Sequence, residues 1–472
     1  MSTVKFGLDF GTTNSSISIF KDGKVEVVEA DKAAADPKVV RSMLFFLRRE
    51  ITYGPKVTPQ QMESQIFMAG DILYQGEQKI LVGQEAVENY LTENRHRKPG
   101  IKRKIFTGRW IRMKDNPDQP KTEPIPEYYE ETDYGTGRLL QALKSSLRTA
   151  YKGTTIFGEF YPVEKLISKL IGELKRKAEE SLGSEIEEIT IGRPVHFSQD
   201  KHVDQRAQNR LAVAMKETGF KKLKFQFEPV AAAKQFLSNS QEKQTILVFD
   251  FGGGTLDTAI VRFGDQVEVL ATDGVYIGGD LLNADIMQAK LWDYFGASST
   301  WGEHGLQMPG YIFEALNSWY SIPSLNNPDV MDLLDRASYK NSDPEALERL
   351  VFLIKTNVGF EVYEAIEKAK KALSDGHETQ IIYQDGPIDL NMAITRQEFE
   401  SIIQPRVEEI EATVIRTLKQ AGLEACDIDK VVRTGGSSLI PVFAEMLENI
   451  FGKEKITLFE TFTSIAAGLA LD

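Results

Sequence analysis

The sequence predicts an α/β protein with two lobes of similar fold, and three observations carry this prediction. First, LDFGTTNSS at Leu8–Ser16 is echoed by FDFGGGTLD at Phe249–Asp257. Second, each stretch joins two apolar strand patterns, and a turn of Gly and Asp then leads into a third strand, which is the signature of a β-hairpin. Third, helical patterns follow in both halves, and strands that alternate with helices are typical of α/β domains. The echo therefore indicates an internal duplication of one structural unit.

The individual elements follow from local patterns in chain order. Strands are expected at 4–10, 15–20 and 24–30 around the turn Asp22-Gly23, and at 245–251, 255–263 and 266–272 around Gly264-Asp265. Helices are expected at 161–183, 203–220, 362–375, 395–422 and 440–452, because apolar residues recur there with helical spacing. Two stretches break the alternation: Lys114–Glu131 is expected to be an exposed loop, and Gly296–Asp343, which holds Trp301 and Trp319, an insertion with a partly aromatic surface.

Composition excludes several classes of function. The chain has 472 residues, enough for two sizeable cores, and a net charge of −13, which argues against a nucleic acid or an anionic membrane as its main partner. One cysteine, Cys426, excludes an internal disulfide and fits a reducing compartment. The sequence shows neither a signal-peptide pattern nor an apolar run of the roughly 20 residues that span a bilayer. The expected location is the cytoplasm.

The two echoed turns have the chemistry of a phosphate site. A Gly-rich turn after a strand offers backbone N–H groups to phosphate oxygens, and Thr and Ser hydroxyls add donors. An Asp at the end of the strand can hold Mg²⁺ through waters. Asp-Phe-Gly does not indicate a protein kinase here, because no His-Arg-Asp loop accompanies it, and there is no P-loop. The five histidines show no metal-binding spacing. A matched pair of turns therefore suggests phosphates held from both sides.

Longer motifs resemble a known family. GLDFGTTNSS, FDFGGGTLD and RTGGSSLIP at Arg433–Pro441 resemble the phosphate and adenosine motifs of the actin-like ATPase superfamily. With EPVAAAKQF, GGDLLNADI and EKAKKALS in the same order, they resemble the nucleotide-binding domain of DnaK-type heat-shock protein 70 chaperones over nearly the whole chain. The resemblance implies a two-lobed actin-like ATPase fold of duplicated ribonuclease-H-like domains with a nucleotide cleft between the lobes. It also implies ATP or ADP and Mg²⁺ as ligands, slow ATP hydrolysis and a chaperone-like or regulatory role.

The resemblance also implies roles for individual residues. Asp9 and Asp250 would hold Mg²⁺ through its waters, and Lys102 in IKRK would reach the phosphates and the attacking water. The implied catalytic residues are Lys102, Glu228, Asp250, Thr255 and Asp257. The implied nucleotide-binding residues are Gly11, Thr12, Thr13, Asn14, Gly252, Gly253, Gly254, Thr255, Gly279, Glu367, Lys370, Lys371, Ser374, Gly435, Gly436 and Ser437. From the residues alone, the basic run Arg95–Arg109 around Lys102 is read as a solvated surface, and the alternative for Glu228 before Pro229 is a helix N-terminal acid.

The resemblance further implies how the chain divides. Lobe I is expected at 1–240, with its core at 1–38 and 156–240, a subdomain with an insertion at 39–155, and a completing C-terminal helix at 457–472. Lobe II is expected at 241–456, with its core at 241–277 and 395–456 and a subdomain with an insertion at 278–394. The chain ends at SIAAGLALD, so no peptide-binding domain is expected, and the chain resembles the stand-alone YegD-like proteins of the family.

Three other functions stay open at this stage. The family's adenine-stacking Arg is Leu439 here and its last acidic position is Phe462, so a module that holds nucleotide without hydrolysing it is one alternative. A sugar or acid kinase shares the fold and is a less favoured alternative, since fold does not fix function. A filament-forming actin relative is the third, and the EKAKKALS helix argues against it. A protein partner or co-chaperone is expected, and its identity is open.

Overall fold

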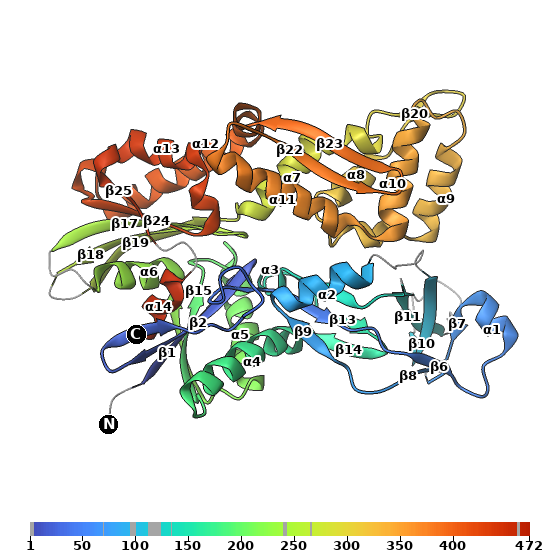
Figure 1. Ribbon diagram of the computed structural model, residues 1–472, viewed down its shortest axis with the longest axis horizontal. Helices are drawn as coiled ribbons and strands as arrows, with labels where there is room; N and C mark the ends of the chain where they lie inside the picture. The colour runs from blue at the N-terminus through green and yellow to red at the C-terminus, as the bar shows by residue number, and fades with distance from the viewer. Residues whose placement is uncertain are drawn as a thin grey trace, which may run out of the picture.

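The computed structural model describes residues 4–68, 70–94, 101–111, 124–133, 135–238, 243–264, 267–459 and 463–472. Two mixed β-sheets with helices packed on them form two lobes, drawn one above the other in Figure 1. The first sheet has the order β16 (Lys222–Phe227), β15 (Glu188–Arg193), β1 (Lys5–Phe10), β2 (Asn14–Lys21), β3 (Lys24–Val27). The second has the order β25 (Ile456–Leu458), β24 (Lys430–Thr434), β17 (Gln244–Phe251), β18 (Leu256–Phe263), β19 (Val267–Val275).

The two sheets repeat one pairing pattern, which confirms the predicted duplication. In each sheet the first strand pairs antiparallel with the second and parallel with a strand from much later in the chain. The echoed motifs occupy equivalent registers, since Asp9 pairs with Ser16 and Asp250 with Asp257. Residue 265, in the predicted turn between β18 and β19, lies outside the described residues.

Helices with one apolar face cover each sheet. On the first sheet α4 (Val163–Leu182) and α5 (Lys201–Glu217) pack against each other, and Leu166, Leu170 and Leu174 of α4 are fully buried or nearly so. The predicted stop of α4 is confirmed, since Gly183 takes the left-handed conformation at φ 76°. On the second sheet α12 (Arg396–Ala421) and α13 (Pro441–Phe451) play the same part. Each lobe therefore has its own apolar core.

Two further helices lie between the sheets. α6 (Glu228–Leu237) packs against β17 and β18, and α14 (Ser464–Ala470) packs against α6, β1 and β2. The approach is backbone to backbone: a Cβ on Gly468 would overlap the carbonyl of Ala231, and one on Gly7 would overlap Ala466 O and Ala470 N. α14, drawn in red, thus lies beside β1 and β2, drawn in blue, although these elements are far apart in sequence (Figure 1).

Short elements form the outer part of lobe I. Apart from β4 (Val40–Arg41), which pairs with β2 in the first sheet, they are β5 (Leu44–Phe46), β6 (Ile51–Tyr53), α1 (Pro59–Ser64), β7 (Ile66–Phe67), β8 (Ile72–Tyr74), β9 (Ile80–Val82), α2 (Gln84–Asn94), β10 (Ile101–Ile111), β11 (Ile125–Asp133), β12 (Arg138–Leu140), α3 (Leu143–Ser146), β13 (Gly153–Ile156) and β14 (Glu159–Pro162). The predicted loop Lys114–Glu131 is wrong for its second half, because β11 pairs antiparallel with β10. Residues 112–123 lie outside the described part of the chain.

Helices dominate the outer part of lobe II. Its elements are α7 (Gly279–Ile286), η1 (Met287–Leu291), η2 (Asp293–Phe295), β20 (Thr300–Trp301), β21 (Leu306–Gln307), α8 (Gly310–Leu316), η3 (Ile322–Leu325), α9 (Pro328–Ala337), α10 (Pro344–Thr356), α11 (Gly359–Asp375), β22 (Glu378–Asp385) and β23 (Ile388–Thr395). The predicted insertion at 296–343 therefore contains helices, and its apolar residues join the lobe II core. No described helix is both long and apolar enough to cross a membrane.

The outer parts of the two lobes touch through an apolar cluster, which we call the cross-lobe cluster. Its buried members are Met43, Phe45, Ala86, Val87, Tyr90, Leu139 and Phe360, with Trp319 packed against them. Phe360 and Trp319 come from lobe II, and the others from lobe I. The Tyr90 and Phe360 rings meet edge to face at 5.3 Å between centroids. Beside the cluster, Arg41 of β4 pairs with both carboxylate oxygens of Glu364 on α11, at 2.7 and 3.1 Å.

Candidate functional site

The two echoed glycine turns face each other between the lobes. A Cβ on Gly253 would overlap Thr13 Oγ1, and one on Gly254 would lie 2.5 Å from Thr12 Oγ1. Glycine is required at both positions because of this close approach. The Thr13 hydroxyl is buried, and it has no hydrogen-bond partner among the described residues. Since a buried hydroxyl without a partner costs free energy, this atom indicates a ligand between the turns.

Four carboxylates and one ammonium group gather beside these turns. Asp9 comes from β1, Asp250 from β17 and Asp257 from β18, and Glu228 is the first residue of α6. Lys144 of α3 reaches Glu228, and its Nζ lies 2.5 Å from Glu228 Oε1 with both side chains buried. The electrostatic influence of Lys144 extends to all three aspartates. We call these five residues the acidic cluster.

Burial and mutual repulsion raise the pKa of the three aspartates. Burial, followed by the charge of Glu228, raises the pKa of both Asp9 and Asp257 to about 7. Burial and then the neighbouring carboxylates raise the pKa of Asp250 well above its ordinary value. Burial would lower the pKa of the Lys144 ammonium, but Glu228 and the aspartates outweigh it and raise this pKa overall. One ammonium group therefore does not balance the carboxylates, and the cluster favours a further cation.

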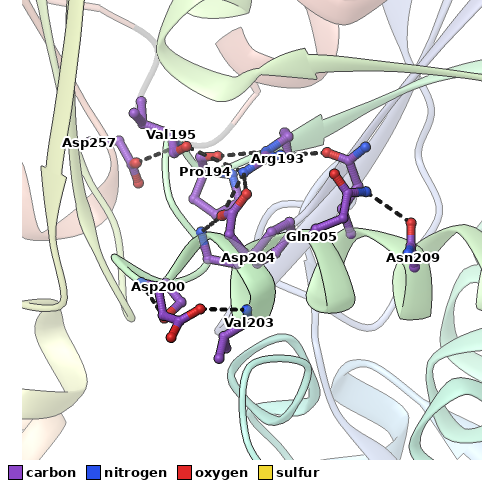
Figure 2. Close-up of polar contacts among 12 residues, drawn as sticks. Arg193, Pro194, Val195, Asp200, Val203, Asp204, Gln205, Asn209 and Asp257 are labelled. Atoms are coloured by element: carbon purple, nitrogen blue, oxygen red, sulfur yellow. Dashed lines mark hydrogen bonds and ion pairs between the residues drawn. The ribbon is translucent and has the colours of Figure 1, made fainter.

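The carboxylate of Asp257 connects the two lobes. Its Oδ2 accepts a hydrogen bond from Thr255 Oγ1 at 2.8 Å, and its Oδ1 accepts one from the backbone N–H of Val195 at 2.7 Å (Figure 2). Val195 follows β15 of the first sheet, whereas Asp257 and Thr255 belong to the hairpin of the second. Movement of one lobe against the other would therefore be transmitted directly to this acid.

Arg193 fixes the segment that carries Val195. Its Nη2 lies 2.8 Å from both carboxylate oxygens of Asp204 on α5, and its Nε donates to Pro194 O at 3.0 Å (Figure 2). Asp204 Oδ1 also accepts from the backbone N–H of Phe197 at 2.7 Å. These charge-assisted hydrogen bonds of Arg193 and Asp204 fix the segment 193–197, so the N–H of Val195 is held toward Asp257.

The structure does not bring Lys102 to the acidic cluster. Lys102 lies in β10, which pairs with β7 and β11, and its Nζ is 4.0 Å from Glu130 on the neighbouring strand. The lysine that lies beside Glu228 is Lys144, which sequence reasoning missed. Residues 95–100 of the basic run lie outside the described part of the chain. A signal for Lys144 was present, because it is a lone charge within the apolar stretch LLQALKSSL.

Lys144 lies on a helix of four residues, too short to be stable by itself. Contacts on both sides place it instead. Leu143 and Leu147 are buried in the lobe I core. Arg210 of α5 donates from Nη1 to Ser146 O at 3.1 Å and to Leu147 O at 3.3 Å. The exit of the helix is thus tied to α5 by a guanidinium group, while its entrance at residue 142 has left-handed backbone at φ 56°.

The lobe II side of the site contains a buried lysine. Lys370 of α11 donates from Nζ to Gly279 O at 2.9 Å and pairs with Glu367 at 2.6 Å. Ser437 Oγ donates to Gly252 O at 2.9 Å, and a Cβ on Gly279 would lie 2.7 Å from that hydroxyl. These contacts join α11, the start of α7 and the turn after β24 to the second glycine turn.

The charge of Glu367 is stabilised by its own helix. Burial would raise the pKa of Glu367, but Lys370 and Lys371 lower it to about 2. Lys371 Nζ lies 3.3 Å from Glu367, and its side chain is 72% exposed. One turn further on, Ser374 is half-buried, and its carbonyl accepts from Arg396 Nη2 at 3.2 Å. The face of α11 that the sequence analysis identified, with Glu367, Lys370, Lys371 and Ser374, is therefore charged. Most of its contacts are made within the protein.

The remaining predicted residues lie in or beside the turns. Gly435 takes φ 80°, and a Cβ there would overlap Phe251 O and lie 3.0 Å from Asp250 Oδ1. Gly436 and Leu439 begin and end η5 (Gly436–Leu439), Asn14 begins β2, and Gly11 O accepts from Ser42 Oγ at 2.8 Å. Phe462 lies outside the described residues.

Among the described residues, the protein alone forms no direct metal-ligand group. Within the described ranges, no three or more His, Cys, Asp or Glu side chains are placed to hold one ion together. Mg²⁺ keeps most of its waters when bound to protein and often takes only one or two carboxylates. The donor set of Asp9 and Asp250, with its excess negative charge, fits an ion held in that way.

Comparison with known families agrees with this arrangement. The model of the family described as Hsp70 protein matches residues 140–299 and 355–472, which is more than half of the chain. The match contains Lys144, Glu228 and the second glycine turn. It leaves out residues 1–139, with the first glycine turn, and residues 300–354, which overlap the predicted insertion. The fold is accordingly the two-lobed actin-like ATPase fold, and Hsp70 proteins bind ATP and ADP in the cleft between the lobes. The chain belongs to the Hsp70 protein family.

Proposed function

We propose that this protein binds Mg-ATP between its lobes and hydrolyses it slowly to ADP and phosphate, with a chaperone-like or regulatory role exerted through a protein partner. The observation that carries the proposal is the acidic cluster, a buried Lys144–Glu228 pair with three aspartates of raised pKa, facing two opposed glycine turns. Within the proposal the lobes divide at residues 240 and 241, and the segment 300–354 fits the second-lobe insertion of the YegD-like proteins.

Each group of residues has a distinct part in this function. The glycine turns and the hydroxyl of Thr13 would donate hydrogen bonds to phosphate oxygens. Lys144 would offset the negative charge that develops on the transferred phosphoryl group, and Glu228 would hold its ammonium in place. Asp9 and Asp250 would hold Mg²⁺ through waters, and the ion would neutralise phosphate charge.

The closeness of the turns bears on how nucleotide would enter. Thr12 and Thr13 lie against Gly254 and Gly253, so phosphates can pass between the turns only when the lobes part. How far the lobes close would then depend on the nucleotide bound between the turns, and a protein partner would sense that nucleotide through the separation of the lobes.

Single-turnover hydrolysis of γ-labelled ATP tests the proposal. With Mg²⁺, we expect phosphate release on the order of 10⁻⁴ to 10⁻² s⁻¹, the range of unassisted NTPase switches. The Thr255→Ala variant loses the hydroxyl that donates to Asp257, and we expect its rate to fall about tenfold or more. If the wild type binds ATP yet releases no phosphate above background, hydrolysis is ruled out and the protein is a nucleotide-gated binding module. Release that depends on an added sugar or acid would indicate a kinase.

Replacing Thr13 by valine separates binding from folding. Because Thr13 Oγ1 has no partner among the described residues, we expect the Thr13→Val variant to keep the thermal stability of the nucleotide-free protein. Its Kd for Mg-ADP should rise about tenfold to a hundredfold, since a hydrogen bond to a charged group contributes roughly 1.5–3 kcal/mol. Calorimetric titration and thermal unfolding measure the two effects. A destabilised variant with unchanged affinity would show that the hydroxyl serves the fold instead.

A further inference from the structure

Trp319 makes a polar contact across the lobes. It lies between α8 and η3, in residues 300–354, the second of the two intervals that the family match leaves out. Its indole Nε1–H donates to Gln141 Oε1 at 2.9 Å, and its ring meets Phe360 edge to face at 5.2 Å between centroids. Gln141 belongs to lobe I, so one indole ring joins the lobe II insertion to lobe I by both an apolar and a polar contact.

Gln141 stands at the entrance to the helix that carries Lys144. It follows β12, and the left-handed residue 142 separates it from α3. Leu139 of β12 is itself a member of the cross-lobe cluster. Because α3 has only four residues, the direction in which Lys144 points depends on how both of its ends are held.

The two ends of this segment are held in different ways. The exit is tied by Arg210, which belongs to lobe I and moves with it. The entrance is held within lobe I by the pairing of β12 with β5, where Leu140 pairs with Leu44, and from lobe II by Trp319. Parting the lobes therefore removes the lobe II contact at Gln141 and leaves the contacts within lobe I.

We propose that Trp319 is a positioning residue for Lys144: through Gln141 it fixes the entrance of α3 when the lobes are closed, so that the insertion couples closure to the placement of the ammonium group. The consequence for hydrolysis rests on the proposed function, but the effect on Lys144 itself does not. A variant without the hydrogen bond between Trp319 and Gln141 keeps all of the site residues but positions Lys144 less accurately.

The Trp319→Phe variant tests this coupling, because phenylalanine keeps a ring in the cross-lobe cluster and removes the Nε1–H donor. The first readout is the rate at which an amine-acylating reagent modifies Lys144 in the nucleotide-free protein, followed by peptide mass spectrometry. We expect this rate to rise about threefold to tenfold, the factor that corresponds to losing one hydrogen bond. The second readout is single-turnover hydrolysis, where we expect a fall of similar size with the Kd for Mg-ATP within about twofold of wild type.

Trp301→Phe is the matched control. Trp301 lies in the same insertion, and its Nε1 is buried without a hydrogen-bond partner among the described residues. We expect it to change neither readout. A further check is Lys370, which is buried on α11: equal increases in the labelling of Lys370 and Lys144 would mean general loosening and would overturn the proposal.

A double-mutant cycle with Gln141→Met gives the sharpest test. Methionine is similar in size to glutamine but cannot accept the hydrogen bond in the same way, so each single variant should raise Lys144 labelling and the double variant should add nothing. Additive effects, or unchanged labelling in Trp319→Phe, would overturn the proposal. Since labelling needs no nucleotide, the positioning role stands or falls separately from ATP hydrolysis.

Discussion

Replacing Lys144 by methionine is expected to lower single-turnover ATP hydrolysis by about two to three orders of magnitude, the loss typical of removing one preorganised electrostatic donor. Lys144 provides the ammonium group of the acidic cluster, 2.5 Å from Glu228, whereas methionine keeps the length of the stem and no charge. We expect the Kd for Mg-ATP to change less than the rate, because the charge on the phosphoryl group grows toward the transition state. Phosphate release and equilibrium binding separate the two quantities.

The chain provides its own control for this experiment in Lys102→Met. Lys102 lies on the β10–β11 hairpin with Glu130 as its neighbouring acid, and we expect no change in rate. Loss of activity in Lys102→Met with full activity in Lys144→Met would reverse the assignment. Removing Lys144 also leaves Glu228 buried without its cation, which costs about 3 kcal/mol of the free energy of unfolding. Adding Glu228→Gln should restore stability without restoring hydrolysis.

Neutralising Asp250 is expected to stabilise the nucleotide-free protein while abolishing its use of Mg-ATP. The raised pKa values of Asp9, Asp250 and Asp257 mean that the folded state keeps protons which the unfolded state has lost. The free energy of unfolding therefore falls as pH rises from about 4, and the part of this loss that is due to Asp9 and Asp257 is complete above about pH 7, where these two residues ionise. In Asp250→Asn the free energy of unfolding should change less with pH than in the wild type. At pH 8 it should be higher than in the wild type by on the order of 3 kcal/mol.

Chemical unfolding at pH 5, 6.5 and 8 measures this effect. Asp335→Asn, at an exposed position on α9, is the control and should keep the wild-type slope. Mg-ADP should stabilise the wild type more at pH 8 than at pH 6, because a cation binds the ionised carboxylates, and it should stabilise Asp250→Asn little at any pH. A variant that is less stable than the wild type at pH 8 would show that the carboxylate of Asp250 is already compensated within the protein.

The central fold could be predicted from the sequence because the local strand and turn patterns there agree with the pairing of the strands in the sheets. The echoed hairpins were predicted from strand patterns and turn residues, and the register of Asp9 and Asp250 follows from them. From residue 125 onward, the loop predicted at Lys114–Glu131 was wrong because the charged residues there alternate with Ile125 and Tyr129 in a strand whose pairing with β10 decides the structure. Tertiary pairing of this kind is not visible in local composition.

The contrast between local motifs and distant contacts also explains which residues of the site could be predicted from the sequence. The glycine turns, Glu228 and α11 were predictable because each motif combines a turn or cap with a chemical group at fixed spacing. Lys144 was not, because its helix has four residues and its place depends on Arg210 and Trp319, both distant in sequence. The resemblance of IKRK to the family motif suggested Lys102 instead, although the charges on such a strand can serve solvent as well as a ligand.

The position of α14 has a consequence for how the protein is made. Ser18 Oγ donates to Ala466 O at 2.5 Å across a separation of 448 residues, and Gly7 lies against the same helix. Chains emerge from the ribosome with the N-terminus first, and domains usually fold as they emerge. Here the first hairpin cannot gain its backing helix until residues 464–470 have been synthesised. We therefore expect the nascent first lobe to remain incomplete, and unable to hold nucleotide, until α14 has emerged.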